Sequence, residues 1–138
     1  MRRKTIEEYI ETIALLEERE GRAQTGAIAS NMGVKPPSAT EMLQKLEQAG
    51  LIHYESYDGA VLTGPGRRLA DELTEKHRTI TDLLDILGVE HGQADLDACQ
   101  IEHHVSAGTV ERLADFVEFV GSDEAAGEFV RRFRSRYR

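Results

Sequence analysis

Cys99, Glu102 and His103 are the residues whose types and spacing are best suited to chemistry. A thiol, a carboxylate and an imidazole all bind first-row transition metals. Residues at positions i, i+3 and i+4 lie on one face of a helix, so the three side chains are expected to converge. The segment therefore predicts half of a metal site, and the remaining ligands must come from elsewhere in the chain.

Each candidate ligand also has an ordinary structural explanation when it is considered alone. A lone cysteine is commonly a small buried hydrophobic residue, and Glu102 with His103 could form an exposed polar pair. His77 lies in the apolar stripe of a predicted helix, where core histidines held by hydrogen bonds are common. Glu8 could complete a capping box with Thr5. The metal interpretation therefore depends on the residues in combination.

The composition is that of a globular protein, because 40% of the 138 residues are hydrophobic and 30% are charged. No apolar run approaches the length of a membrane span, and the basic N-terminus leads into an acidic segment. Neither a membrane segment nor a signal peptide is expected, which predicts a cytoplasmic protein. The single cysteine cannot form an internal disulfide.

The formal net charge of −8 argues against passive coating of nucleic acid. The charge is unevenly distributed along the chain. Residues 1–71 carry 9 basic and 11 acidic side chains, whereas residues 72–138 carry 8 and 14. The first half is therefore the better partner for a polyanion such as DNA.

Capping residues and hydrophobic spacing predict three helices at the start of the chain. Thr5 is expected to cap residues 5–20, and Thr25 is expected to cap a shorter helix over 26–31. A third helix should begin at the prolines 36–37, since proline is well tolerated in a first turn. Its buried stripe would consist of Ala39, Met42, Leu43 and Leu46.

A hairpin is predicted after the third helix. Two short β-prone runs, 51–55 and 60–63, flank Asp58-Gly59, a dipeptide typical of hairpin turns. The order helix, short helix, turn, helix, hairpin is that of a winged helix-turn-helix. In such a domain the second helix of the pair enters the major groove and the hairpin lies along the backbone.

The rest of the chain is predicted to be helical. A long helix should begin at about Arg67, after the punctuation Gly64-Pro65-Gly66, and end at Leu87. Its apolar stripe would include Leu87, followed by Gly88 as a stop. Further helices are expected over 94–105 and 107–120, with a last helix capped by the segment 122–124.

With these elements placed, the chain resembles the diphtheria-toxin-repressor and manganese-transport-regulator family of metal-dependent transcriptional repressors. The likeness extends from about residue 5 to residue 120. It rests on Glu8-Tyr9-Ile10-Glu11, Pro37-Ser38-Ala39-Thr40, the wing from Gly59 to Gly66, His77 and the set Cys99, Glu102 and His103, all in order. The resemblance implies a mainly α fold: a winged helix-turn-helix over 1–71, then an all-helical dimerisation and metal-binding domain over 72–138. The two-domain form, without the SH3-like third domain of iron-type members, is expected.

The resemblance also implies metal ligands from three helices. Carried over position by position, they are Glu8, Glu11, His77, Cys99, Glu102 and His103. Iron-type members have methionine and cysteine at the positions of Glu8 and Cys99, whereas manganese-type members have aspartate and glutamate. This chain combines a carboxylate with a thiol, so the expected cofactor is Fe(II) or Mn(II), with Co(II), Ni(II) and Zn(II) as suitable substitutes.

Metal binding is expected to act as a switch. Gathering Glu8, Glu11 and Glu102 in one small volume is unfavourable without a cation, because like charges repel strongly in a partly buried site. A divalent ion would therefore fix the first helix, and with it the DNA-reading helix, against the second domain.

The implied function is repression of metal-uptake genes by a homodimer that binds palindromic operator DNA when metal is bound, without enzymatic activity. Helices within about 72–120 would form the two-fold interface, with half-sites about 34 Å apart. The expected DNA contacts are Thr25, Lys35, Pro37, Ser38, Thr40, Glu41 and Gln44. Glu41 is unusual among them, and it would either accept a hydrogen bond from a cytosine amino group or face solvent.

Two alternatives stay open at this point. A winged-helix regulator could respond to an organic ligand or a protein signal instead of a metal. The carboxylate–histidine cluster could also belong to a metal-dependent hydrolase. An enzyme, however, needs an open coordination position and a substrate cleft, and no nucleophile motif accompanies the cluster.

Overall fold

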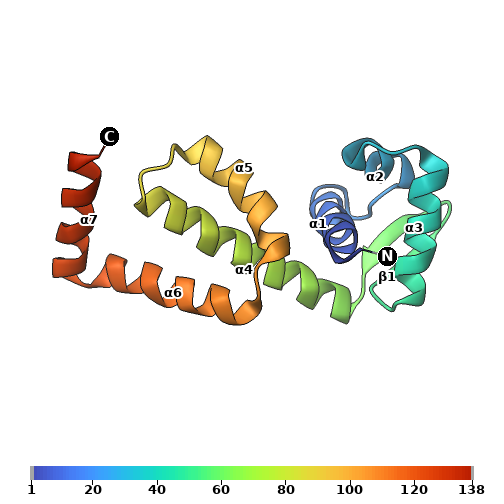
Figure 1. The fold of residues 1–138 in the computed structure, drawn as a ribbon. Helices are drawn as coiled ribbons and strands as arrows, with labels where there is room; N and C mark the ends of the chain where they lie inside the picture. Colours follow the sequence, from blue (N-terminus) through green and yellow to red (C-terminus); the bar gives the residue numbers. More distant parts are fainter. Residues whose placement is uncertain (1, 138) are drawn as a thin grey trace. The chain divides into compact units, whose positions relative to one another are not determined.

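The computed structural model describes residues 2–137 (Figure 1). In chain order, the elements are α1 (Arg3–Glu20), α2 (Thr25–Met32), α3 (Pro36–Gln48), β1 (Ile52–Glu55), β2 (Gly59–Leu62), α4 (Gly64–Ile86), α5 (His91–Ile101), the 3-10 turn η1 (Glu102–His104), α6 (Ala107–Ser122) and α7 (Glu124–Arg136). The chain forms two compact units, Met1–Leu73 and Thr74–Arg138, and the boundary falls within α4. The mainly α fold with an N-terminal winged helix-turn-helix is confirmed.

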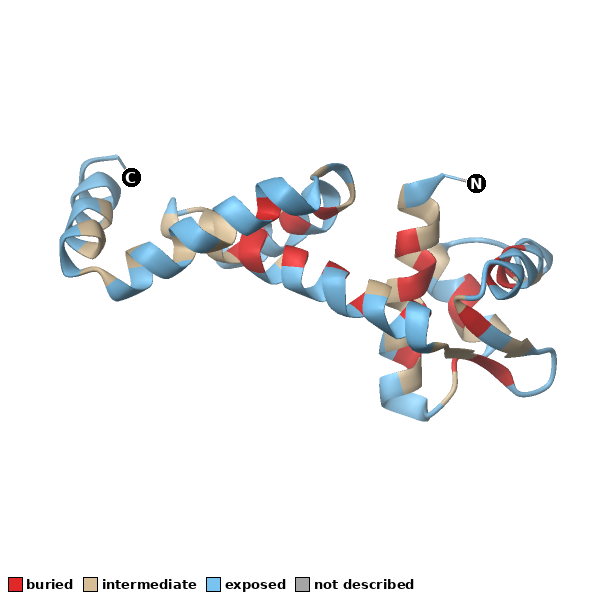
Figure 2. Ribbon diagram, turned by 90° about the horizontal axis from the view of Figure 1, so that it is seen from below, coloured by how far each residue is buried: buried red, intermediate tan, exposed pale blue. Residues whose placement is uncertain are grey.

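The first unit has a closed hydrophobic core. Ile10 and Ile13 of α1 and Ile28 of α2 are fully buried, as are Leu43 and Leu46 of α3. The predicted stripe of α3 is confirmed, because Ala39, Met42, Leu43 and Leu46 are its buried residues. Figure 2 shows this concentration of buried positions along α1.

The predicted hairpin is also confirmed. β1 and β2 pair antiparallel, and Glu55 stands opposite Gly59 at the turn. Gly59 has a φ of +84°, and a Cβ there would collide with the carbonyl of Ala23. The wing therefore requires glycine at this position, because Ala23 and Ala60 exchange backbone hydrogen bonds of 2.9 and 2.8 Å.

Two of the predicted caps are wrong. α1 begins at Arg3, so Thr5 lies inside the first turn, and the capping residue Arg2 makes no side-chain cap. An ion pair of 3.4 Å between Arg3 and Glu7 lies within the first turn of this earlier start. Thr25 is the first residue of α2 rather than its cap, and its hydroxyl forms a 3.1 Å hydrogen bond with the hydroxyl of Tyr54.

The second unit also departs from the predicted helix boundaries. α4 begins at Gly64 rather than Arg67 and ends at Ile86, because the hydroxyl of Thr63 accepts a hydrogen bond from the Gly66 amide, as an N-cap does. Leu87 lies beyond the helix and is 49% exposed. The expected continuous helix to residue 105 is wrong, since α5 ends at Ile101 and η1 follows it.

Three side chains cap the later helices. Glu90 accepts hydrogen bonds from the Gly92 and Gln93 amides and so starts α5 three residues earlier than expected. These two donors lower the pKa of the Glu90 carboxyl. Ser106 caps α6, and Asp123 caps α7 as predicted.

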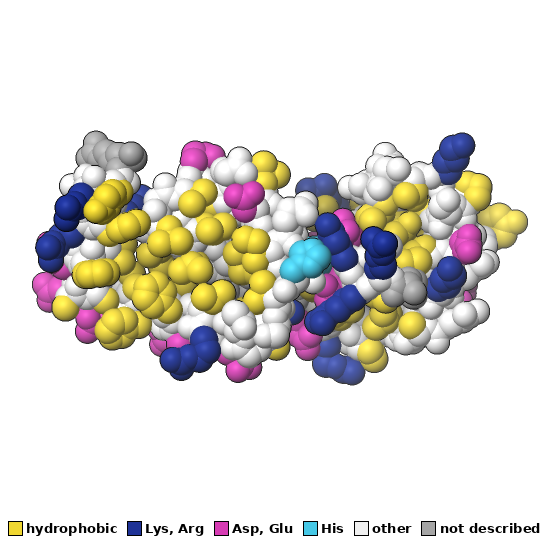
Figure 3. Space-filling view, in the orientation of Figure 1, with side chains coloured by type: hydrophobic (Ala, Val, Ile, Leu, Met, Phe, Trp, Pro, Cys, Tyr) yellow, Lys and Arg dark blue, Asp and Glu magenta, His cyan; other side chains and the backbone are white. Residues whose placement is uncertain are grey.

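The second unit leaves a wide apolar face uncovered. Ile86, Leu87, Phe116, Phe119, Val120, Ala126, Phe129, Val130 and Phe133 line a groove of about 400 Å³. Figure 3 shows hydrophobic side chains gathered over this part of the unit. We call the groove and its lining the apolar face of α4, α6 and α7. Among the described residues, none of the helices combines the length and the hydrophobicity needed to span a membrane.

Candidate metal centre and nucleic-acid interface

His77 lies at the centre of a cluster of possible ligands in the second unit. Its Nδ1 lies 2.9 Å from Oε2 of Glu102 and 3.8 Å from Sγ of Cys99. Its Nε2 lies 2.6 Å from Oδ1 of Asp95. The two ring nitrogens therefore face different acidic groups, and the imidazole links α4 to both α5 and η1.

The end of α5 places Glu102 and Cys99 in different environments. Glu102 opens η1, where its side chain is 1% exposed, whereas Cys99 on the last turn of α5 is exposed. The buried ammonium group of Lys76 donates a 3.1 Å hydrogen bond to the Val105 carbonyl. Since Lys76 neighbours His77 on α4, this bond holds the end of η1 beside the imidazole.

The second imidazole of the motif also meets the buried carboxylate. Nε2 of His103 lies 3.4 Å from Oε1 of Glu102, and the His103 side chain is 3% exposed. Glu102 thus has one oxygen toward each of two histidines. Although α5 ends before Glu102, the 3-10 geometry of η1 still directs Glu102 and His103 inward. The two side chains therefore converge, as their spacing predicts.

These side chains suit a divalent transition metal. Two imidazoles, a thiol that binds as thiolate and a buried carboxylate match the ligand types that such ions take. A buried carboxylate is costly unless a cation or hydrogen bonds compensate for its lost hydration. His77, Cys99, Glu102 and His103 are therefore the residues of the second unit that would hold the ion.

Asp95 is the member of this cluster that the sequence analysis missed. It precedes Cys99 by four residues and Glu102 by seven, a spacing that places all three on one helix face. The spacing can be seen in the sequence, but an aspartate among other acidic residues does not by itself indicate a metal site. Its pairing with His77 emerges only when α4 and α5 are packed together.

The two remaining predicted ligands lie on α1, in the first unit. Glu8 and Glu11 are separated by three residues, which places both on the same helix face, and both are half-buried. The neighbouring Glu7 is buried and pairs with Arg3. Burial raises the pKa of Tyr9 on the same helix.

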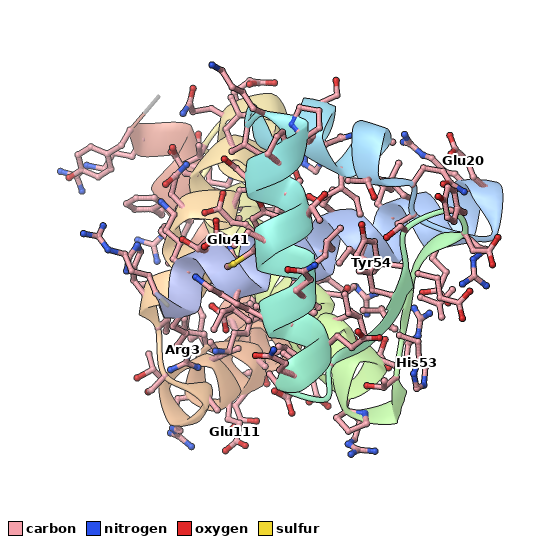
Figure 4. All side chains as sticks on the ribbon, turned by 90° about the vertical axis from the view of Figure 1, so that its right-hand side faces the viewer. Arg3, Glu20, Glu41, His53, Tyr54 and Glu111 are labelled. Atoms are coloured by element: carbon pink, nitrogen blue, oxygen red, sulfur yellow. The ribbon has the colours of Figure 1, made fainter. Side chains whose placement is uncertain are left out.

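Thr25 begins α2, and the other predicted DNA-contacting residues lie in the turn between α2 and α3 and on α3. Lys35, Pro37, Ser38, Glu41 and Gln44 are exposed, whereas Thr25 and Thr40 are half-buried. Figure 4 looks onto α3 with Glu41 on its surface and with His53 and Tyr54 on the adjacent strand. Lys45 approaches Glu41 to 3.6 Å, which offsets its negative charge.

The wing extends beside this face. Its tip carries Tyr57, which is 97% exposed. The guanidinium of Arg22 donates a 2.6 Å hydrogen bond to the Asp58 carbonyl, and the Gln24 amide donates a second bond to it. The turn of the wing is therefore tied to the segment between α1 and α2.

Comparison with known proteins accounts for most of the chain. Residues 1–60 match the family described as "Iron dependent repressor, N-terminal DNA binding domain". Residues 63–130 match "Iron dependent repressor, metal binding and dimerisation domain". Both halves of one regulator architecture are thus present in order.

Curated relatives and solved structures agree with these matches. The HTH-type transcriptional regulator MntR of Geobacillus kaustophilus (strain HTA426) is 36% identical over 132 residues, covering 96% of this chain and 94% of that protein. MntR of Bacillus subtilis (strain 168) is 36% identical over 121 residues, covering 88% and 85%. The structure of the metal-dependent transcriptional regulator MtsR superposes with a TM-score of 0.74 at 30% identity, and covers 83% of this chain and 54% of that one.

The resemblance drawn from the sequence is confirmed by these comparisons, and a regulator responding to an organic ligand is not favoured. The donor set around His77 fits a divalent metal ion, in keeping with the metal-binding domain that the chain matches. The chain therefore belongs to the iron-dependent repressor family and is a metal-responsive transcriptional regulator.

Proposed function

We propose that this regulator represses metal-uptake genes by binding palindromic operator DNA as a homodimer while Fe(II) or Mn(II) is bound, and that it is not an enzyme. The observation that carries the proposal is the cluster around His77, with Glu102 2.9 Å from Nδ1 and Cys99 3.8 Å from it. A regulator that acts on chromosomal DNA would work in the cytoplasm.

Residues 1–71 would form the DNA-binding domain and residues 72–138 the dimerisation and metal-binding domain. The proposed ligands are Glu8, Glu11, His77, Cys99, Glu102 and His103. A divalent ion held by these side chains would supply the positive charge that offsets the repulsion among their carboxylates. His77 and Glu102 would hold it in the second domain, and the α1 carboxylates would then favour the domain arrangement that completes its coordination.

The mixed donor set bears on the choice of metal. Thiolate favours Fe(II), Co(II), Ni(II) or Zn(II), whereas the carboxylates of Glu8 and Glu11 suit Mn(II). Among similar solved structures, SloR is described as a manganese regulator and ScaR was solved with bound Zn²⁺. We propose that Fe(II) and Mn(II) both activate this chain, with Co(II), Ni(II) and Zn(II) as substitutes.

DNA recognition is assigned to the exposed side of α3 and the turn before it. Ser38, Glu41 and Gln44 are spaced so that they share this side of the helix. Lys35 would contact phosphate, and Thr25, Pro37 and Thr40 would fix the position of the helix in the major groove.

The homodimer is supported by the apolar face of α4, α6 and α7. Phe116, Phe119 and Phe129 are 47%, 55% and 70% exposed in the single chain. Contiguous aromatic exposure of this kind is typical of an interaction surface. A second copy of the chain would cover it and set two α3 helices about one turn of DNA, roughly 34 Å, apart.

The decisive experiment compares operator binding with and without metal. Duplexes are first selected from a random library with wild-type protein and Mn(II) or Fe(II) under anaerobic conditions. The affinity for the selected duplex is then measured with each metal and with chelator. We expect the wild type to bind the operator only with metal. We expect His77→Ala to bind it no better with metal than with chelator.

His91→Ala is the matched control, because His91 is an exposed histidine of the same unit that pairs with Asp85. It should retain the full metal response. Equal affinity with metal and with chelator would defeat the proposal. DNA binding that needs no metal and is unchanged in both His77→Ala and Cys99→Ala would favour a signal other than metal, whereas an unchanged metal response in both variants would mean that the metal acts through other ligands. A turnover assay on the metal-loaded protein tests the hydrolase alternative.

A further inference from the structure

We propose that Asp95 is a positioning residue for the metal site: its carboxylate accepts the Nε2 proton of His77 and so presents Nδ1 to the metal. The inference rests on the proposed function, because it assumes that His77 binds a metal. It assigns a role to a residue that lies outside the six proposed ligands.

The two nitrogens of His77 divide the cluster between them. Nδ1 faces the thiol and carboxylate that are proposed ligands, at 3.8 Å from Cys99 and 2.9 Å from Glu102. Nε2 faces the carboxylate of Asp95, whose Oδ1 lies 2.6 Å away. Nδ1 is therefore the nitrogen on the ligand side, and Nε2 is the nitrogen left to hold a proton.

A neutral imidazole that binds a metal through one nitrogen must carry its proton on the other. A carboxylate that accepts this proton fixes the tautomer and the ring orientation, and it makes the ligating nitrogen more basic. Asp95 is in position to do both. Its side chain is 57% exposed, whereas that of His77 is 25% exposed. The carboxylate can therefore remain hydrated while it holds a partly buried ring.

A second aspartate–histidine pair in the same unit shows what an ordinary surface contact looks like. His91 is 75% exposed, and Nδ1 lies 3.2 Å from both carboxylate oxygens of Asp85. Within residues 2–137, Nε2 of His91 has no contact with a second carboxylate or with a thiol. His77, by contrast, is held from both sides, by one short contact to Asp95 and by the proposed ligands.

The experiment uses the full-length protein and Co(II) as a spectroscopic probe. Affinity is measured for the wild type and for Asp95→Asn, Asp95→Glu and Asp97→Asn. Asp97→Asn is the matched control, because it removes the same charge from the same helix, where Asp97 accepts a 2.9 Å hydrogen bond from Gln93. Loss of an orienting carboxylate is expected to weaken metal affinity by about 10- to 100-fold.

Asp95→Asn should show this loss, Asp95→Glu should recover part of it, and Asp97→Asn should bind like the wild type. At saturation, the thiolate-to-Co(II) absorption of Cys99 should persist in every variant, since the donor set is unchanged. The circular dichroism of the metal-free variants should match that of the wild type. An equal affinity in Asp95→Asn and Asp97→Asn would overturn the proposal.

A measurement on the wild type alone keeps the proposal testable if Asp95→Asn does not fold. In the Zn(II)-loaded protein, ¹⁵N spectra of the imidazoles should show that His77 has its proton on Nε2 and its metal on Nδ1. Metal on Nε2 would overturn the role of Asp95. Failure of the wild type to bind Co(II) or Zn(II) at all would instead contradict the proposed function itself.

Discussion

The two units of the chain differ in how completely they bury their own hydrophobic side chains. The first unit encloses large residues from every helix, such as Ile10, Ile28 and Leu43, each at 0% exposure. In the second unit, the buried hydrophobic residues among those described are Ile80, Ala94, Ala98 and Val110, while its phenylalanines stay largely exposed.

Both units also bury charged side chains, and in the first unit the buried Glu7 pairs with Arg3. The second unit buries Glu102 and Lys76 close to His77, a costly arrangement for so small a core. The first unit thus has a closed core beneath its DNA-binding helices, whereas the second leaves hydrophobic side chains exposed along one groove. This difference suits a regulator, because the part of a protein that responds to a ligand is usually less stable on its own than the part that does not.

The largest effect is expected from a charge on the exposed apolar face. Phe119→Glu would place a carboxylate in the contact between two copies, so the protein should become monomeric. A monomer loses the gain from engaging two half-sites at once, which reduces operator affinity by roughly 10²- to 10⁴-fold. Sedimentation velocity and titration of operator DNA measure the two outcomes.

Leu15→Glu is the control, because Leu15 is also an exposed hydrophobic residue, at 39%, but lies on α1 of the first unit. It should leave the oligomeric state unchanged. If Phe119→Glu remains a dimer with wild-type affinity for the operator, the apolar face of α4, α6 and α7 is not the dimer interface.

The next effect concerns the closed core of the first unit. Leu43→Ala removes a side chain of 0% exposure, so it should lower the free energy of unfolding by about 2–5 kcal/mol. Leu96→Ala, at a residue of the second unit that is 64% exposed, should change it by no more than about 0.5 kcal/mol. Urea unfolding followed by circular dichroism compares them. Equal losses of unfolding free energy in the two variants would mean that the buried core of the first unit contributes no more to stability than an exposed leucine of the second.

The fold of the first unit was largely predictable from the sequence, because the patterns that indicate its helices and hairpin each involve only a few neighbouring residues. The spacing of Met42, Leu43 and Leu46 and the Asp58-Gly59 turn each report on a few consecutive residues. The errors there are at the caps. Thr5 and Thr25 have the right residue type for an N-cap, but α1 begins at Arg3 and the Thr25 hydroxyl contacts the hydroxyl of Tyr54.

The candidate metal centre was predictable only in part. Cys99, Glu102 and His103 are close in sequence, so spacing alone brings them together. The pairing of Asp95 with His77 joins residues 18 positions apart on two helices, and no local pattern encodes such a contact. The cap at Glu90 was missed because glutamate is an uncommon residue at that position.

Removing a charged side chain should also destabilise the first unit more than the second, although by less than the core substitution does. Glu17 in the first unit is 20% exposed; it accepts a hydrogen bond from the Leu62 amide and pairs with Arg67 at 3.0 Å. Glu17→Gln should therefore cost about 1 kcal/mol, because an acceptor oxygen remains but the negative charge that strengthens both contacts is lost. Glu128→Gln breaks a pair in which both side chains are more than 60% exposed, and should cost about 0–0.5 kcal/mol. Urea unfolding measures both, and a larger loss for Glu128→Gln would contradict the comparison.

The smallest effect is a pH dependence that arises at the N-terminus of α5, in the second unit. The amides of Gly92 and Gln93 lower the pKa of Glu90 below its ordinary 4.5, so the charged cap favours the folded state above that pH and the benefit is lost as the pH falls through the lowered value. Glu90→Gln keeps an acceptor oxygen but cannot titrate. The difference in melting temperature between it and the wild type, measured by circular dichroism on metal-free protein, should therefore shrink as the pH is lowered below about 4.5. Glu111→Gln, at an exposed position that caps no helix, controls for the loss of a carboxylate. A difference that stays constant with pH would mean that the Glu90 charge does not stabilise α5, the helix that carries Asp95 and Cys99.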